Sequence, residues 1–288
     1  LDPFSGKKRQ LRLVAAIDGY SRVIVHAQLY FNENRPCIED TLMKAILKHQ
    51  LPMIFYCDNA RVFQSQHLKR IAAELGFRVK HSRPRTPQGR GRIERWFRTV
   101  AEKFDPLLKE QIKSGKLTSL GEVNDFFNAW LERRYHDRRH GTLKMSPRQA
   151  LEIAKKSGLD FSRSVSVQAV REIFLWREYR DVSSVAAVKI YSNLYEVDES
   201  LVGKKVELRF NPYDLRRILV YYEGIFRGEA NPYQMKNFTE PRVKALQIDS
   251  SSALDHAMKA IVKEHKEDIV KRSGLSFARA MEVKKEDE

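Results

Sequence analysis

Apolar positions in the first third of the chain follow two different periods. Two runs rich in β-forming residues, Leu11–Ile17 and Val23–Phe31, flank turn residues at 18–22, and we expect them to form an antiparallel hairpin. From Cys37 to His49 the apolar residues fall three or four positions apart, which predicts an amphipathic helix. Met53–Cys57 is a short apolar run bounded by polar residues, the pattern of a buried strand.

A further alternation of helix and strand follows this run. Helical spacing over Ser65–Leu75 ends at Gly76, Phe77–His81 is predicted to be a short strand, and another helix is expected to open near Arg92. Strands first and alternation afterwards indicate an α/β fold, with a mixed sheet and helices on its faces.

The middle of the chain keeps a helical pattern. Apolar residues recur at helical spacing over Ser119–Arg134, and Ser146-Pro147 is a signal for the start of a further helix. This pattern fades between Asp160 and Ser166, so we expect a domain boundary there.

Residues 173–233 have a different character, because short β-rich runs alternate with turn signals. Four or five strands at this spacing predict a small barrel. The runs are Ala187–Tyr191, Leu194–Val197, Lys205–Phe210 and Arg217–Tyr222. Beyond Gln234 the chain is charged, and we expect a surface helix over Ala253–Arg272 together with disorder.

Charge narrows the classes of partner. The 288 residues carry a formal net charge of +16, which favours a polyanion such as nucleic acid. No run of eighteen apolar residues and no signal peptide is present, so we expect no membrane insertion. The two cysteines, Cys37 and Cys57, form no Cys-x-x-Cys pair and predict buried thiols in a reduced intracellular setting.

Two acidic residues are the candidate catalytic and metal-ligating groups. Asp58 follows the predicted strand Met53–Cys57 at its carboxyl end, the edge where ligands bind in open α/β sheets. Glu94 falls in the first turn of the helix near Arg92, and 35 residues lie between the two acids. Carboxylate oxygens suit Mg²⁺, and two such ions serve in-line displacement at phosphorus.

A basic loop separates the two acids and is the candidate DNA-contact region. Arginine binds phosphate oxygens through its fork of N–H groups, and glycines allow the backbone to approach a nucleic-acid strand closely. The candidate DNA-binding residues are Arg83, Arg85, Gln88, Arg90, Arg92, Arg95 and Arg98.

The same residues carry a resemblance to a known family. Asp58 followed by Asn59, the approach Arg83-Pro84-Arg85-Thr86-Pro87-Gln88-Gly89-Arg90-Gly91-Arg92-Ile93-Glu94-Arg95 and the 35-residue spacing resemble the catalytic core of retroviral integrases and bacterial insertion-sequence transposases. The signature of that family is two Asp and one Glu. The following barrel-like region resembles the small β-barrel of Mu-like transposases.

The resemblance implies a fold, an activity and partners. It implies an RNase H-like core over 1–160, expected to be truncated at its N-terminus, and a Mu-like barrel over 161–240. The charge pattern, independently of the resemblance, predicts a charged helical tail over 241–288. The implied function is that of a DDE-type transposase or integrase that cleaves and joins DNA with Mg²⁺ or Mn²⁺. It further implies DNA partners (transposon ends and target), a homo-multimer in a synaptic complex, and a location in the bacterial cytoplasm with the nucleoid.

The first Asp of the signature has no clear counterpart in this chain. The resemblance places it in a strand before the hairpin, so we expect it upstream of Leu1. Asp18 lies in the hairpin turn and is predicted to bond its own backbone instead. Asp2 is nearer the right place, but Pro3 follows it and no strand surrounds it.

Structural explanations compete with several of these assignments. Glu94 could be a first-turn acid favoured by the helix dipole, Asp58 a turn or cap residue, and the arginines a solvated basic face. His136 and His140 lie four apart, yet without a third ligand we expect DNA contact or a structural hydrogen bond, not zinc. Five aromatic residues are expected in the core: Trp96, Phe97, Phe104, Trp130 and Trp176.

Two other functions remain open from sequence. One is a catalytically inactive DNA-binding remnant or assembly subunit of a transposon, which the missing first Asp favours. The other is a nuclease of the RNase H kind, against which the trailing barrel speaks, since a nuclease needs no such extra domain.

Overall fold

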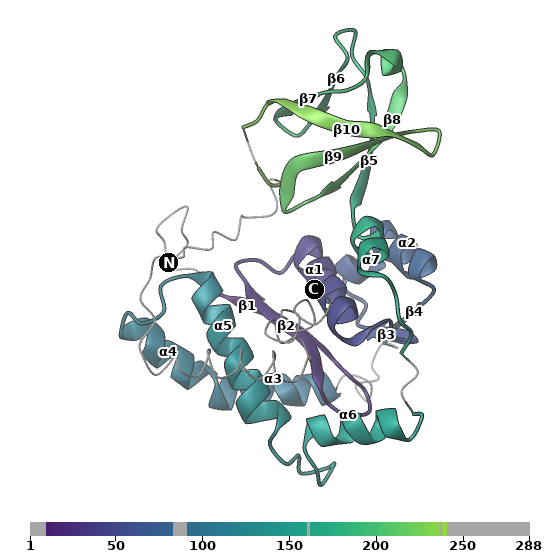
Figure 1. The fold of residues 1–288 in the computed structure, drawn as a ribbon. Helices are drawn as coiled ribbons and strands as arrows, with labels where there is room; N and C mark the ends of the chain where they lie inside the picture. Colours follow the sequence, from purple (N-terminus) through teal and green to yellow (C-terminus); the bar gives the residue numbers. More distant parts are fainter. Residues whose placement is uncertain (1–9, 83–90, 160–161, 237, 241–288) are drawn as a thin grey trace, which may run out of the picture. The chain divides into compact units, whose positions relative to one another are not determined.

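The computed structural model describes residues 10–82, 91–159, 162–236 and 238–240 (Figure 1). The chain divides into two compact units, and each combines stretches that are far apart in sequence. Unit 1 comprises residues 1–29, 91–160 and 247–288, and unit 2 comprises residues 30–90 and 161–246. The domain limits expected from the sequence (1–160, 161–240 and 241–288) stay a prediction, and the last of them lies outside the described residues.

Unit 1 begins with the predicted hairpin. Strands β1 (Arg12–Ile17) and β2 (Ile24–Tyr30) pair with each other, and their six-residue connection is too short for a parallel crossover. The helices of this unit are α3 (Gly91–Lys103), α4 (Asp105–Lys113), α5 (Leu120–Trp130) and α6 (Pro147–Lys156). A π-helical segment, η3 (Leu131–His136), continues α5 directly.

Aromatic side chains form the core of unit 1. Phe104 contacts Phe127 edge to face at 4.9 Å between ring centroids and lies 5.2 Å from the Trp130 ring. Trp96 is 2% exposed and meets Phe127 at 6.4 Å. The sequence-based core assignment is therefore confirmed for Trp96, Phe104 and Trp130, as it is for the buried Trp176 of unit 2, but it is wrong for Phe97. That ring is 37% exposed, because it lies one position beyond the buried face of α3.

Unit 2 opens with an alternation of helices and strands. Its first elements are α1 (Arg35–His49), β3 (Ile54–Cys57), η1 (Arg61–Gln64), α2 (Gln66–Leu75) and β4 (Arg78–His81). Strands β3 and β4 pair in parallel, with Cys57 opposite His81 at their carboxyl ends. Within the described residues, these strands form two separate two-stranded sheets, β1–β2 in unit 1 and β3–β4 in unit 2, where the sequence predicted one mixed sheet. The α/β character of the fold is as predicted.

Strand β3 is less buried than its apolar sequence predicts. Phe55 packs toward α2 and contacts Phe63 at 6.1 Å, whereas Ile54 and Tyr56 are 43% and 39% exposed. Successive side chains of a strand point to opposite faces, so only one face of β3 is covered by the α2 cluster.

A short helix, α7 (Val167–Ile173), leads into a six-stranded sheet. The strands are β5 (Trp176–Asp181), β6 (Ala187–Ile190), β7 (Asn193–Glu196), β8 (Lys205–Asn211), β9 (Asp214–Tyr222) and β10 (Ile225–Gln234), with the 3₁₀ turn η4 (Glu199–Leu201) before β8. Their order is β5-β8-β9-β10-β7-β6, antiparallel at each pairing described. The sequence anticipated a barrel of four or five strands, and β5 and β10 are the strands it did not delimit.

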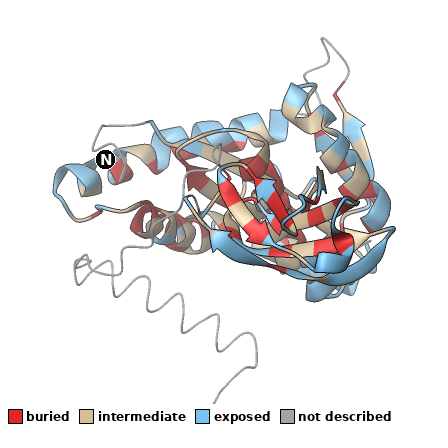
Figure 2. Ribbon diagram, turned by 90° about the horizontal axis from the view of Figure 1, so that it is seen from above, coloured by how far each residue is buried: buried red, intermediate tan, exposed pale blue. Residues whose placement is uncertain are grey.

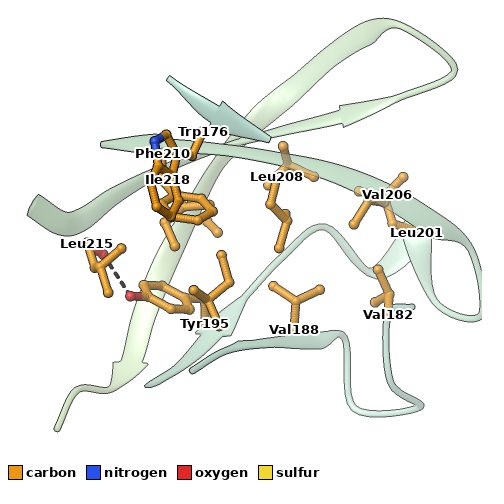
Figure 3. Close-up of a cluster of buried hydrophobic side chains, with 13 residues drawn as sticks. Trp176, Val182, Val188, Tyr195, Leu201, Val206, Leu208, Phe210, Leu215 and Ile218 are labelled. Atoms are coloured by element: carbon orange, nitrogen blue, oxygen red, sulfur yellow. Dashed lines mark hydrogen bonds between the residues drawn. The ribbon is translucent and has the colours of Figure 1, made fainter. Parts of the chain in front are cut away.

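The six strands curl into a nearly closed barrel around one apolar core. Along β8, buried Val206, Leu208 and Phe210 alternate with more exposed neighbours. Each of the other strands also contributes buried side chains to this core, and buried residues are red in Figure 2. Figure 3 shows these side chains converging, with the Tyr195 hydroxyl donating to the Leu215 carbonyl at 2.7 Å. At the open seam, the Arg180 side chain of β5 donates to the Lys189 carbonyl of β6 at 3.1 Å.

Helices α1, α2 and α7 pack together in unit 2. Their buried cluster includes Leu42, Ile46, Leu68, Ile71 and Val170. Among the described helices, none has the length and apolar character that crossing a bilayer requires.

Candidate active site

Asp58 occupies the carboxyl end of β3, where the sequence predicted it. The residue is half-buried, and its Oδ1 accepts a hydrogen bond of 2.9 Å from the Ala60 N–H. Because β3 and β4 run in parallel, their carboxyl ends meet at one edge. The groups that surround Asp58 therefore come from the ends of both strands.

His81, at the end of β4, holds the Asp58 backbone. Its Nδ1 lies 3.0 Å from the Asp58 carbonyl oxygen. A carbonyl oxygen only accepts, so Nδ1 carries the proton and Nε2 of the neutral ring presents a lone pair. Sequence analysis did not select His81. Its position, just before the Arg-rich segment and opposite Cys57, the residue that precedes Asp58, was the available signal.

The side-chain amide of Asn59, the residue after Asp58, links the ends of β3 and β4. Its Nδ2 donates to the Ser82 carbonyl at 2.8 Å, and the Ser82 N–H donates to the Cys57 carbonyl at 2.9 Å. Together with the bond from His81, three hydrogen bonds tie the end of β3 to the end of β4. The Asp58 backbone is thus fixed on both sides.

Cys57 lies beside Asp58 but is a poor nucleophile and ligand. Burial, followed by the negative charge of Asp58, raises the pKa of the Cys57 thiol to about 12. The thiolate is the reactive and metal-binding form, so this group is inert near neutral pH. Both cysteines are buried and free, as the sequence predicted.

Glu94 lies in the first turn of α3, in unit 1, and is exposed. Three of the predicted DNA-binding residues share this helix: Arg92, Arg95 and Arg98 are all exposed, and Arg98 lies one turn beyond Glu94. The other four predicted contacts, Arg83, Arg85, Gln88 and Arg90, lie outside the described residues, as does Asp2.

Asp18 is the turn residue that the sequence predicted. Its Oδ2 accepts from the Ser21 N–H and Ser21 hydroxyl, both at 2.6 Å, and from the Tyr20 N–H at 3.1 Å. These bonds close the β1–β2 turn and occupy the carboxylate oxygen that faces it.

His136 has a structural role. It is buried, and its Nε2 accepts the Ile24 N–H at 3.0 Å, so the proton is on Nδ1, which donates to Glu132 at 3.1 Å. Of the two roles that the sequence left open, DNA contact or a structural hydrogen bond, the structure shows the hydrogen bond for this residue.

The donor types fit a hard divalent cation, since Asp58 and Glu94 offer carboxylate oxygens, which Mg²⁺ and Mn²⁺ prefer. Within the described residues, no group of three or more His, Cys, Asp or Glu side chains is arranged to hold a metal. The two acids belong to different compact units, Asp58 to unit 2 and Glu94 to unit 1.

Two family models match the chain. The model described as integrase core domain matches residues 2–87, and the one described as Mu transposase, C-terminal, matches residues 171–226. The first match includes Asp58 and Asn59, and the second includes most of the barrel strands.

A curated relative agrees with these two matches. The transposase for transposon Tn552 of Staphylococcus aureus is 24% identical over 283 residues, which cover 90% of this chain. The match spans 56% of the relative, so this chain corresponds to little more than half of that protein's length.

Solved structures of integrases are also similar. The catalytic core of BIV integrase is 17% identical, with a TM-score of 0.40 over 51% of this chain and 90% of its own. The HTLV-2 integrase core, solved with magnesium, is 16% identical, with a TM-score of 0.40 over 50% of this chain and 86% of its own. A chain of a simian T-cell lymphotropic virus intasome, solved in complex with the PP2A regulatory subunit B56 gamma, is 15% identical. Its TM-score is 0.43, over 82% of this chain and 75% of its own.

The sequence matches confirm the expected resemblance to integrase and transposase catalytic cores and to the Mu-like barrel, whereas the roles of Asp58 and Glu94 stay predictions. Residues 2–87 of the chain thus resemble an integrase core domain, and residues 171–226 resemble the C-terminal domain of Mu transposase.

Proposed function

We propose that this chain is the catalytic part of a DDE-type transposase that cleaves and joins DNA during transposition. The observation that carries the proposal is the strand-end Asp58-Asn59 pair inside the integrase core match, with Glu94 opening a basic helix 35 residues later. The partners are the transposon ends and target DNA, and the protein acts as a homo-multimer in the bacterial cytoplasm, with the nucleoid.

Asp58 and Glu94 are the proposed metal ligands, with Mg²⁺ or Mn²⁺ as the cofactor. Such ions, when bound, favour attack by an oxygen and departure of another at phosphorus. The role of this chain is then to hold the carboxylates still: His81 and Asn59 fix the Asp58 backbone, and Ala60 orients its Oδ1.

The proposed reaction has two steps, cleavage of the transposon end and transfer of that end to target DNA. Water first attacks the phosphorus at the transposon end, a P–O bond to the 3′ oxygen breaks, and a free 3′ hydroxyl remains. That hydroxyl then attacks a target phosphodiester, forming one P–O bond as another breaks. No covalent intermediate with the protein is needed, in keeping with the raised pKa of the neighbouring Cys57 thiol.

Arginines supply the proposed contacts to the DNA backbone. Arg92, Arg95 and Arg98 flank Glu94 on α3, and the loop residues Arg83, Arg85, Gln88 and Arg90 precede it. Guanidinium groups bind phosphate oxygens in pairs, which positions DNA without reading its sequence.

A strand-transfer assay tests the proposal. The chain, and a form extended upstream along its reading frame, are incubated with a pre-cleaved transposon end, target DNA and Mn²⁺. We expect the extended form to join the transposon end to the target DNA. Asp58→Asn and Glu94→Gln should each abolish this joining. Asp125→Asn on α5 and Glu102→Gln on α3 are matched controls, since both side chains are exposed acids, and they should leave joining intact.

The contrary outcome identifies the alternative function. If the extended protein binds DNA in a salt-sensitive manner but does not join it, and Asp58→Asn and Glu94→Gln leave that binding unchanged, the chain is an inactive DNA-binding or assembly subunit. Cleavage of an RNA–DNA hybrid without joining would instead identify a nuclease of the RNase H kind.

A further inference from the structure

Two arginines from different elements of unit 1 converge on one backbone oxygen. Arg22, in the β1–β2 turn, and Arg92, in the first turn of α3, both donate to the Gly19 carbonyl through their Nη1 atoms. A Cβ at Gly19 would meet Arg92 Nη1 at 3.4 Å, so the α3 side chain lies close against the turn. Arg22 itself has a φ of 65°, a conformation unfavourable for residues with a Cβ.

The positive charges in this region are crowded. Burial, followed by the charge of Arg92, lowers the pKa of Arg22, and Arg95 contributes in the same direction. Asp18 opposes this effect, but its Oδ2 is engaged by the backbone and hydroxyl of the turn. Like charges repel unless an anion lies among them, so the arrangement is more favourable with an anion bound.

His140 adds a neutral donor to the same region. Its Nδ1 accepts from the Thr142 N–H at 3.3 Å and the Leu143 N–H at 3.4 Å, so the proton of the neutral ring is on Nε2. Burial, followed by the charges of Arg22 and Arg95, lowers the pKa of His140. This lowered pKa favours the neutral ring, whose N–H is on Nε2, and shows that the ring is within electrostatic range of Arg22 and Arg95.

These groups share one chemical property: each has an N–H donor, and the single acceptor among them, Nδ1 of His140, is already occupied by the Thr142 and Leu143 N–H groups. Every guanidinium has five N–H groups, and the bonds to Gly19 use one each from Arg22 and Arg92. Arg22 and Arg92 thus meet at the Gly19 carbonyl, and Arg95 and His140 are within electrostatic range of Arg22. Glu94 lies between Arg92 and Arg95 in the sequence of the same helix.

We propose that Arg22, Arg92, Arg95 and His140 form an oxyanion site that holds one phosphate of the DNA backbone. The identification of the anion as DNA rests on the proposed transposase function. A phosphodiester fits because it offers two unesterified oxygens to paired N–H donors and belongs to a polyanion. Arg22 and His140, from outside the arginine-rich loop, are the new members of the DNA-contact surface.

Salt-dependent DNA binding tests the charged part of the site. The full chain is titrated into fluorescein-labelled duplex DNA at several KCl concentrations, and log K is plotted against log[KCl]. Each phosphate contact contributes a slope of about −0.9 for duplex DNA, so Arg22→Gln should reduce the slope by about one contact. Lys109→Gln on α4 removes one exposed charge outside the site and is the matched control.

His140 should behave differently, because it is a neutral donor. His140→Asn keeps an oxygen that can accept from Thr142 and Leu143 but lacks the outer N–H. We expect it to weaken DNA binding about tenfold at every salt concentration, with the slope unchanged. Thermal unfolding of each variant is measured in parallel. We expect His140→Asn to have the same unfolding midpoint as the wild type.

A second readout separates the anion site from the DNA function. The ring nitrogen signals of ¹⁵N-histidine-labelled protein are recorded with inorganic phosphate alone and with the duplex. A shift of the His140 Nε2 signal with DNA, lost in Arg22→Gln, supports the proposal. A shift with inorganic phosphate only identifies a small-anion site and overturns the assignment to DNA.

Two further results would contradict the proposal itself. One is an Arg22→Gln slope that equals the Lys109→Gln slope, and the other is an unchanged DNA affinity in His140→Asn. If the wild-type chain shows no salt-dependent DNA binding, the proposed transposase function fails, and the phosphate arm still reports whether the anion site exists.

Discussion

Backbone groups decide which ring nitrogen of three histidines carries the proton. The Asp58 carbonyl places it on Nδ1 of His81, the Ile24 N–H places it on Nδ1 of His136, and two loop N–H groups place it on Nε2 of His140. The first histidine supports a proposed metal ligand, the second closes a packed core, and the third presents a donor. One residue type thus performs three tasks because its backbone partners differ.

The first residue-scale prediction concerns His81. Its Nδ1–H is the group that holds the Asp58 carbonyl, and an asparagine amide can occupy that position, whereas glutamine places its amide near Nε2. We expect His81→Ala and His81→Gln to raise the Mn²⁺ concentration for half-maximal joining by about tenfold, as for other partners that orient metal ligands. His81→Asn should retain nearly the wild-type value.

The measurement is strand transfer as a function of Mn²⁺ concentration, with the maximal rate fitted separately from the metal dependence. Thermal unfolding controls for a general loss of stability. Loss of metal affinity in His81→Asn to the same extent as in His81→Ala would show that the outer nitrogen, and not the bond to Asp58, is what matters.

Single-residue roles were only partly predictable from sequence. Asp58 and Glu94 follow from a strand end, a helix start and their spacing, and Asp18 from turn chemistry. His81, Arg22 and His140 do not, because their partners are set by tertiary contacts. The bond from Arg92 to Gly19, for example, joins residues 73 positions apart, and no local pattern encodes that distance.

At the scale of elements, local capping signals determined where helices begin. Ser65, Ser119 and Ser146 each accept an N–H of the first turn, as their positions before apolar periodic runs predicted. Helix α4 and strands β5 and β10 were not delimited in the sequence. In β10, for example, Gly228 and Pro232 interrupt the period of two on which such a prediction depends.

Strand β5 is joined to helix α1 of unit 2 by a buried hydrogen bond. Trp176 Nε1 donates to Glu39 Oε2 at 2.8 Å, and the Arg35 guanidinium lies 4.3 Å from the Trp176 ring. Both Trp176 and Glu39 are buried, so this carboxylate depends on protein partners. His67 Nδ1 lies 2.9 Å from the other oxygen, though the alignment does not make a hydrogen bond.

The element-scale prediction compares two buried tryptophans. Trp176→Phe removes a donor from a buried carboxylate, which costs about 1–3 kcal/mol beyond the loss of packing. Trp96 is equally buried, but within the described residues its Nε1 has no hydrogen-bond partner. Trp96→Phe is therefore the matched control, since it removes similar volume and no hydrogen bond.

Urea unfolding of the two variants provides the comparison of free energies. We expect Trp176→Phe to lower the unfolding free energy more than Trp96→Phe does, by the hydrogen-bond contribution. Equal losses would mean that Glu39 finds another partner, for example Arg35, whose Nε lies 3.7 Å from its Oε1.

At the scale of the whole molecule, the positive charge is distributed unevenly along the sequence. Residues 176–234, the barrel strands, contain nine basic and nine acidic residues, so the formal charge of +16 arises outside them. Several barrel arginines are also paired with acids. Arg216 bonds Asp214 at 2.6 Å, and Arg217 donates to Glu229 from both Nε (2.8 Å) and Nη2.

This distribution predicts which charges contribute to DNA affinity. Counterion release requires cations that exchange their surroundings for phosphates, and an arginine already paired with a carboxylate gains less from that exchange. We therefore expect the double variant Arg216→Gln, Arg217→Gln to keep a DNA affinity within about twofold of the wild-type value. Its salt slope should stay within about 0.3 of the wild-type slope, whereas one phosphate contact contributes about 0.9.

Arg95→Gln on α3 removes only one charge, where the barrel variant removes two, but it should reduce the slope by about 0.9. Anisotropy titrations over a range of KCl measure both. A larger slope change in the barrel variant than in Arg95→Gln would place the DNA backbone on the barrel and contradict the assignment of the phosphate contacts to the core.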